Sequence, residues 1–280
     1  MPFSPTSRCR RLVLTVLFAA ILPPLAEPAL AQGRMEANYR LSLAGLEIGK
    51  ASLTAEIDDS EYSLIGTGRV AGLMRAISSG KGSAAARGTL SPQKISPRLF
   101  AVSAEAGGKS EGIRFVITPT GIADLVVDPP TKPAPDRVEI TEANLVGVID
   151  PLSGAFPQVP GTANPLSAIA CERTIPVFDG RQRFDLALSF ERIEPVKIEK
   201  GFSGTAVVCR VRYIPVAGHR STRPAIKYMR ENKEIRIWLV PVAGTRMLAP
   251  FKVSVETPVG KVELEATSFM TEAKASVPQK

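Results

Sequence analysis

Side chains that could support acid–base or nucleophilic chemistry are few in this sequence and lie far apart along it. The single histidine, His219, lies in a polar segment, and Asp179 and Asp185 flank the expected start of a strand. A histidine could serve as the base of a Ser-His-Asp triad, and two carboxylates could act as acid and base on a glycosidic bond. No Gly-x-Ser-x-Gly motif accompanies the histidine, so solvated side chains are the alternative interpretation.

Two glycine-rich segments approach the spacing of nucleotide-binding motifs. Gly66-Thr-Gly68-Arg-Val-Ala71 fits a dinucleotide fingerprint, but the acidic residue expected about 20 positions later is absent. Gly80-Lys-Gly-Ser83 resembles the end of a phosphate loop, but Arg75 stands where its first glycine belongs. One histidine and three cysteines in 280 residues also argue against a metal site. The sequence therefore predicts neither a cofactor nor a metal.

The N-terminus has the three parts of a secretory signal. Arg8, Arg10 and Arg11 precede an uninterrupted apolar run over 12–22, and Ala29-Leu-Ala31 supplies a small-x-small cleavage site. The apolar run is shorter than the roughly 20 residues of a membrane-spanning helix, and no later stretch approaches that length. We predict a signal peptide over 1–31 cleaved after Ala31, a periplasmic location and no transmembrane anchor in the mature chain.

Cleavage would remove Cys9 and leave two cysteines, Cys171 and Cys209. An even cysteine count in an oxidising compartment favours a disulfide. Two buried thiols are the alternative.

Basic side chains gather near the middle of the second half of the chain. They are Arg210, Arg212, Arg220, Arg223, Lys227, Arg230, Lys233 and Arg236. Export makes nucleic acid an unsuitable partner, whereas anionic lipid headgroups, lipopolysaccharide phosphates and acidic proteins fit this charge. A solvated basic face is the simpler interpretation.

The elements that must position these residues read mainly as strands. Apolar and polar residues alternate over 39–43, 184–190, 207–213 and 235–240, which is typical of half-buried strands. Helical patterns cover only 70–79 and 141–149. We therefore predict an all-β fold with minor α content, built as an antiparallel curled sheet or incomplete β-barrel.

Turn chemistry divides this predicted fold further. Strands over 251–255 and 262–266 flank Thr257-Pro-Val-Gly260, which indicates a hairpin. Four prolines in 128–135 predict a surface loop rather than a domain boundary. We expect a single β-rich domain over 32–280 with a frayed tail over 271–280.

A cysteine-bracketed segment carries a family resemblance. Cys171 is followed by Phe178-Asp-Gly-Arg181, and Cys209 lies on the next long strand, which ends near Gly218-His219. With the opening Tyr39–Gly49, this segment resembles a domain-of-unknown-function family of exported proteobacterial proteins, over about residues 35–270. The resemblance implies a periplasmic location and a mostly antiparallel β fold similar to that of the periplasmic lipoprotein carriers. It assigns no catalytic residues.

These observations favour a non-enzymatic protein of envelope maintenance that binds a lipid, another amphipathic ligand or an envelope protein. We expect partner contact at the turn that holds Phe178, Asp179, Arg181 and Arg183, together with His219. A hairpin turn with only a structural role is the alternative for this motif. Alternatives for the whole protein are a hydrolase acting on an envelope polymer and a purely structural scaffold.

Overall fold

The computed structural model describes residues 32–72, 79–199 and 201–274. Within this part of the chain, 13 antiparallel strands form one sheet in the order β7-β6-β5-β4-β3-β2-β1-β13-β12-β11-β10-β9-β8. The strands are β1 (Gly33–Leu43), β2 (Leu46–Ile57), β3 (Glu61–Val70), β4 (Lys81–Leu90), β5 (Ile95–Ala106), β6 (Lys109–Thr118), β7 (Gly121–Asp128), β8 (Arg173–Phe178), β9 (Arg183–Lys197), β10 (Ser203–Ala217), β11 (Ile235–Pro241), β12 (Leu248–Thr257) and β13 (Gly260–Ala273). The predicted all-β class and antiparallel sheet are confirmed.

The sheet consists of two meanders joined through their outermost strands in sequence. β1–β7 form one meander and β8–β13 the other, and β1 pairs with β13 from Gly33↔Ala273 to Leu43↔Val262. The edges are therefore β7 and β8, which are neighbours along the chain. No pairing joins these two edges among the described residues, so the sheet curls without closing into a barrel.

The alternation of side chains determines which face of each strand is buried. On β1, Met35, Ala37 and Tyr39 are buried, while Asn38 and Arg40, on either side of Tyr39, are exposed. Successive side chains of a strand point to opposite faces. This pattern therefore brings one face of the first meander against the core.

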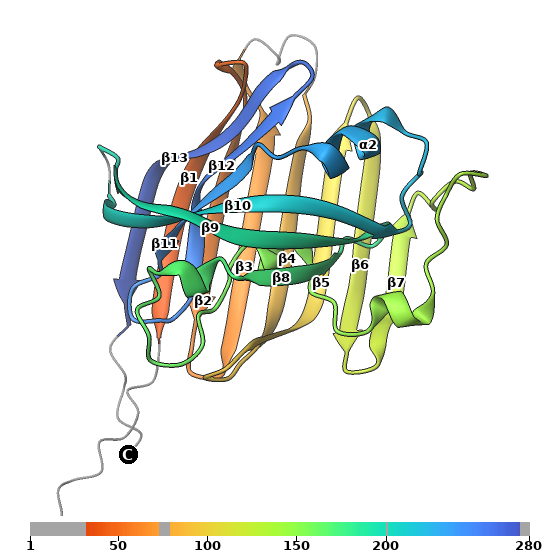
Figure 1. Ribbon diagram of the computed structural model, residues 1–280. Coiled ribbons are helices and arrows are strands. Elements are labelled where there is room, and N and C mark those ends of the chain that lie inside the picture. The colour runs from red at the N-terminus through yellow and green to blue at the C-terminus, as the bar shows by residue number, and fades with distance from the viewer. Residues whose placement is uncertain (1–31, 73–78, 200, 275–280) are drawn as a thin grey trace, which may run out of the picture.

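Aromatic rings connect the two meanders across the core. β8, β9 and β10 run across the front of β3–β7 (Figure 1). Phe178, at the end of β8, lies 5.3 Å from Phe115 of β6, whose ring is 5.2 Å from that of Phe100 on β5. All three rings are buried, so this stack holds the second meander on the first.

The hairpin expected around Thr257–Gly260 is confirmed. Val255 pairs with Val262 on β12 and β13, and Thr257 pairs with Gly260 across the turn. β13 continues to Ala273, so residues 271–273 of the expected tail are strand, and 275–280 lie outside the described residues. Thr271 accepts a hydrogen bond from the Ala243 amide at 2.8 Å, which ties this last segment down.

Helical structure is sparse, as expected, but differs in position. The elements are η2 (Glu142–Leu145), α1 (Pro151–Gly154), η3 (Ala168–Ala170) and α2 (Pro224–Glu231). The helix predicted over 141–149 is only the η2 turn, because Gly147 has a φ of +70° and a new element starts at Pro151. Most of the helix predicted over 70–79 lies outside the described residues.

The predicted disulfide between Cys171 and Cys209 is confirmed. The two Cα atoms are 5.4 Å apart, and both residues are fully buried. They pack in a small apolar cluster with Val159, Val207 and Leu248. The bridge therefore attaches the long connection between β7 and β8 to the centre of β10.

Candidate functional site

An apolar groove of about 660 Å³ lies between the first meander and the elements packed over it. One wall is the buried-side face of β2–β5. The other is formed by Leu152 and Ala155, at α1, and by Ile237, Val253 and Leu264 of β11–β13. This volume lies within the roughly 300–1,000 Å³ typical of small-molecule pockets.

Small residues in register make room for this groove. Ala51 pairs with Gly68, Gly68 with Gly82, and Gly82 with Ala104, so four adjacent strands present no large side chain at this level. The groove exists because the cross-strand neighbours are small together.

Gly68 leaves more room for a side chain on β3 than the neighbouring Gly66 does. A methyl group added there would have its nearest neighbour, the Lys50 carbonyl oxygen, 3.9 Å away. At Gly66, by contrast, the added group would meet Leu53 at 3.5 Å and Leu152 at 4.0 Å. Gly68 shares its face with the buried Leu64 by strand alternation.

Tyr39 contributes an aromatic ring to the groove without a free polar group. Its hydroxyl donates a hydrogen bond to the Pro250 carbonyl at 2.6 Å. Burial raises the pKa of Tyr39, so the side chain is neutral at ordinary pH. The groove therefore offers an apolar surface that suits hydrocarbon rather than a charged group.

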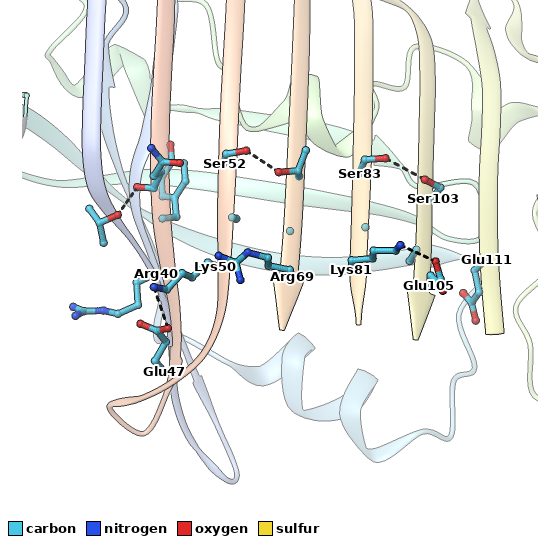
Figure 2. A pocket seen from close by; sticks show the side chains of 18 of the residues that line it. Arg40, Glu47, Lys50, Ser52, Arg69, Lys81, Ser83, Ser103, Glu105 and Glu111 are labelled. Carbon is cyan, nitrogen blue, oxygen red and sulfur yellow. Dashed lines mark hydrogen bonds and ion pairs between the residues drawn. The ribbon is translucent and has the colours of Figure 1, made fainter. Parts of the chain in front are cut away.

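The opposite face of the same strands is polar. Figure 2 shows Arg40, Lys50, Arg69 and Lys81 in one row across β1–β4, and each is the direct cross-strand partner of the next. Acidic neighbours balance part of this charge. Lys50 lies 3.6 Å from Glu47, Lys81 lies 3.2 Å from Glu105, and Arg40 lies 3.2 Å from Glu265.

A second row of polar side chains runs beside these charges. The hydroxyls of Ser52 and Thr67 are 2.7 Å apart, and those of Ser83 and Ser103 are 3.1 Å apart (Figure 2). β2–β5 thus form a wall that is apolar on the groove side and hydrogen-bonding on the other side.

The Phe178–Arg183 turn, where we expected partner contact, makes extensive contacts within the protein. The Asp179 carboxylate accepts hydrogen bonds from the Arg181 amide at 2.7 Å and the Gln182 amide at 2.6 Å. Burial raises the pKa of Asp179, and these two hydrogen bonds oppose that rise. Phe178 itself is buried in the aromatic stack.

Arg181 attaches this turn to the proline-rich loop, whereas Arg183 contacts the η2 turn and β9. Arg181 donates to the Pro129 carbonyl at 3.0 Å and to the Thr131 hydroxyl at 3.1 Å. Arg183 donates to the Asn144 carbonyl at 3.2 Å and forms an ion pair with Asp185 at 2.7 Å. These contacts accord with the structural alternative for the motif, and a partner-binding role for these residues stays a prediction.

His219 lies close to the same turn but is largely enclosed. Its exposed fraction is 8%, and its carbonyl accepts a hydrogen bond from the Val138 amide at 2.9 Å. The preceding Gly218 contacts the Arg181 carbonyl oxygen, and a Cβ added to Gly218 would lie only 2.2 Å from that oxygen. Within the described part of the chain, the His219 side chain makes no hydrogen bond or ion pair with Asp179 or Asp185. Neither of the two carboxylates considered for acid–base chemistry is therefore paired with this histidine.

The sequence contained a signal for the groove in two glycine-rich segments that fail as nucleotide-binding motifs. Gly66, Gly68 and Gly82 belong to the two segments that approach nucleotide-binding spacing. The structure places them on β3 and β4, where they line the groove. In the three described segments, no group of three or more His, Cys, Asp or Glu residues could hold a metal. None of the helices described is long and apolar enough to span a membrane.

Comparison with known proteins adds a family but no activity. The family described as "Protein of unknown function (DUF3108)" matches residues 38–267. No curated protein matches the chain. A similar solved structure is a β-barrel-like protein of the domain of unknown function DUF1849 from Brucella abortus, at 8% identity and a TM-score of 0.44. That similarity covers 88% of this chain and 99% of the other.

Proposed function

The chain belongs to the DUF3108 family, and we propose that it is a non-enzymatic protein of the cell envelope that holds the hydrocarbon part of an amphiphile in its groove. The signal-like residues 1–31, which lie outside the described residues, support export to the periplasm. The proposal depends on one observation, the apolar groove of about 660 Å³ bounded by β2–β5, α1 and β11–β13.

Hydrocarbon is the chemistry that this groove would recognise best. Each methylene group moved from water into such a site contributes roughly 0.8 kcal/mol. A chain of many methylene groups would therefore bind without any hydrogen bond to the wall. The polar end of the amphiphile would remain outside, because a charged group buried among Leu41, Val253 and Leu264 would lose its hydration.

Native mass spectrometry of the purified protein tests whether a ligand is carried. We expect a non-covalent adduct of lipid mass that disappears when the protein is denatured. If the protein shows only its polypeptide mass and also fails to bind a fluorescent fatty acid added in solution, the proposal is wrong.

Replacing Gly68 with leucine should block the groove. The added side chain would occupy free space on β3, so we expect binding of the fluorescent fatty acid to fall at least tenfold. Stability should be unchanged or slightly higher, because glycine weakens a strand interior. Fatty-acid titration and urea unfolding measure the two effects.

Gly112 on β6 provides the matched control. A methyl group there would also have open space, with the Val102 carbonyl oxygen 4.0 Å away. Gly112 alternates with Ile113, which packs on the core, so it points to the other face. Gly112→Leu should therefore keep full binding, and an equal loss in both variants would show that the groove is not the site.

A further inference from the structure

Helix α2 is basic and incompletely packed. The segment 223–233 holds four basic residues against one acid, Glu231. Lys227 and Arg230 are three residues apart and share one side of the helix, whereas Ile226 and Met229 share another and are only half-buried. A basic amphipathic helix of this kind is typical of a surface that lies on a membrane.

The structure also separates the basic residues that are internally paired from those that are not. Arg210 and Arg236 both bond Glu191, at 2.8 and 2.9 Å, and Arg220 bonds Asp136 at 2.7 Å. Arg223, Lys227 and Lys233 form no ion pair with any described residue, and Arg230 has only Glu231 at 3.4 Å. Arg212 on β10 also forms no ion pair with any described residue, so most of the unpaired charge of the basic cluster lies on α2 or directly beside it.

Two hairpin tips with exposed apolar side chains lie next to one another beside the end of α2. Asn232 donates to the Glu256 carbonyl at 2.8 Å, next to the β12–β13 turn, where Val259 is 73% exposed. The Ala44 amide donates to the Lys261 carbonyl at 2.8 Å, which joins the β1–β2 turn to this one. Leu46, just after the β1–β2 turn, is 63% exposed.

We call this continuous surface the rim: the segment 223–233, the turn 257–260 and residues 44–46. Figure 1 shows α2 and both tips at one end of the molecule, and Figure 2 shows α2 just beyond the ends of β3–β5. The groove reaches the same end, since its lining includes Val70 at the end of β3, Lys81 at the start of β4 and Ala106 at the end of β5.

We propose that the rim docks on the surface of a lipid bilayer that carries anionic lipids. The basic side of α2 would lie against the headgroups, and Leu46 and Val259 would enter the interface. Charge complementarity selects an anionic surface, and the two tips select a bilayer rather than a soluble polyanion. This inference rests on the proposed function at one point only: docking would bring the groove next to the bilayer that supplies its lipid.

Flotation of the purified protein with vesicles tests this docking. We expect it to float with phosphatidylcholine vesicles that contain one quarter phosphatidylglycerol, and not with pure phosphatidylcholine. Lys227→Glu with Arg230→Glu should reduce flotation at least tenfold, because each basic residue near such a surface adds substantial attraction. Leu46→Asn with Val259→Asn should reduce it at least threefold. Retention of full binding by either double variant, or equal binding to neutral vesicles, would overturn the proposal.

The control places the same charge change at the other end of the strands. Lys94 and Arg98 are exposed near the start of β5, far along the strand from Ala106. Lys94→Glu with Arg98→Glu should float like the unmodified protein, and a loss equal to that of the α2 variant would also contradict docking through the rim. Circular dichroism melts show whether each variant is folded.

Docking and ligand binding can fail separately. Gly68→Leu should lose the fluorescent fatty acid in solution and still float with anionic vesicles. The α2 double variant should bind the fatty acid and not float. If Gly68→Leu binds the fatty acid normally, the proposed function fails while docking stands.

Discussion

Asp150 is a fully buried carboxyl group that begins helix α1. Its Oδ1 accepts a hydrogen bond from the Ser153 amide at 2.8 Å, and the Ser153 hydroxyl lies 2.8 Å from that of Tyr62. Burial raises the pKa of Asp150, and the hydrogen bonds from Ser153 offset only part of that effect. At neutral pH the native state therefore holds this carboxylate under a desolvation penalty.

Asp150→Asn should be at least as stable as the unmodified protein at pH 7, because asparagine retains the cap without the charge. A raised native pKa means that the native state binds the proton more tightly than the unfolded state. This group's contribution to stability therefore rises as pH falls toward about 4, the ordinary value for aspartate. We expect the advantage of the variant to disappear over that range in urea unfolding. An Asp150→Asn variant that is less stable than the unmodified protein at pH 7 and stays less stable in acid would contradict this.

Asp150→Ala is the matched control, since it removes the charge and the cap together. It should be about 1 kcal/mol less stable than Asp150→Asn at every pH.

At the scale of the elements, the long connection from β7 to β8 is held by hydrogen bonds and a disulfide rather than by strand pairing. Its residues 156–160 run beside β12, where the Leu248 amide donates to the Pro157 carbonyl at 3.0 Å. Arg246 donates to the Val159 and Ala163 carbonyls, each at 2.7 Å. The disulfide from Cys171 to Cys209 holds the far end of this segment.

Replacing both cysteines with serine should lower the free energy of unfolding by about 2–4 kcal/mol. The bridge spans a sequence separation of 38 residues, so its removal restores conformational freedom to a long loop in the unfolded state. Paired urea titrations of the unmodified protein and the variant measure this loss. Identical midpoints would mean that the bridge does not stabilise the fold.

At the scale of the whole molecule, the open sheet has two edges that must be kept together and protected. Exposed edge strands invite pairing with other chains. The Phe178–Arg183 turn meets this need from one side, because it packs on β6 and bonds the loop that follows β7. Gly180 fits there with a φ of +95° and with Ile113 directly beside it.

Gly180→Ala should therefore lower the free energy of unfolding of the curled sheet. A Cβ at this position would come within 2.2 Å of Ile113 Cγ2, so the cost of overpacking, about 1–3 kcal/mol, is added to the backbone cost of a positive φ. Gly107, with a φ of +57° and open space around it, is the control. Gly107→Ala carries only the backbone cost, about 1 kcal/mol. Equal unfolding free energies for the two variants would show that the turn does not hold the sheet.

Several features of the fold could be predicted from sequence because they depend on local information. Alternation of apolar and polar residues over five or more positions identifies a strand, and Thr257–Gly260 identifies a hairpin, since both patterns are complete within a short segment. The disulfide followed from counting the cysteines that remain after the predicted removal of residues 1–31. Helix α2 was missed, because it is only eight residues long and none of its side chains is fully buried.

The sequence by itself determined the all-β class and the antiparallel hairpin, and it favoured the pairing of Cys171 with Cys209 over two buried thiols. Only the tertiary structure decided that Ala51, Gly68, Gly82 and Ala104 lie side by side, because cross-strand register joins positions that are 14 to 22 residues apart along the chain. It likewise decided that the Phe178–Arg183 turn packs on β6 and bonds the loop that follows β7. Small residues in a strand mean a weak strand when taken alone, and they make a groove only when their neighbours on adjacent strands are small as well.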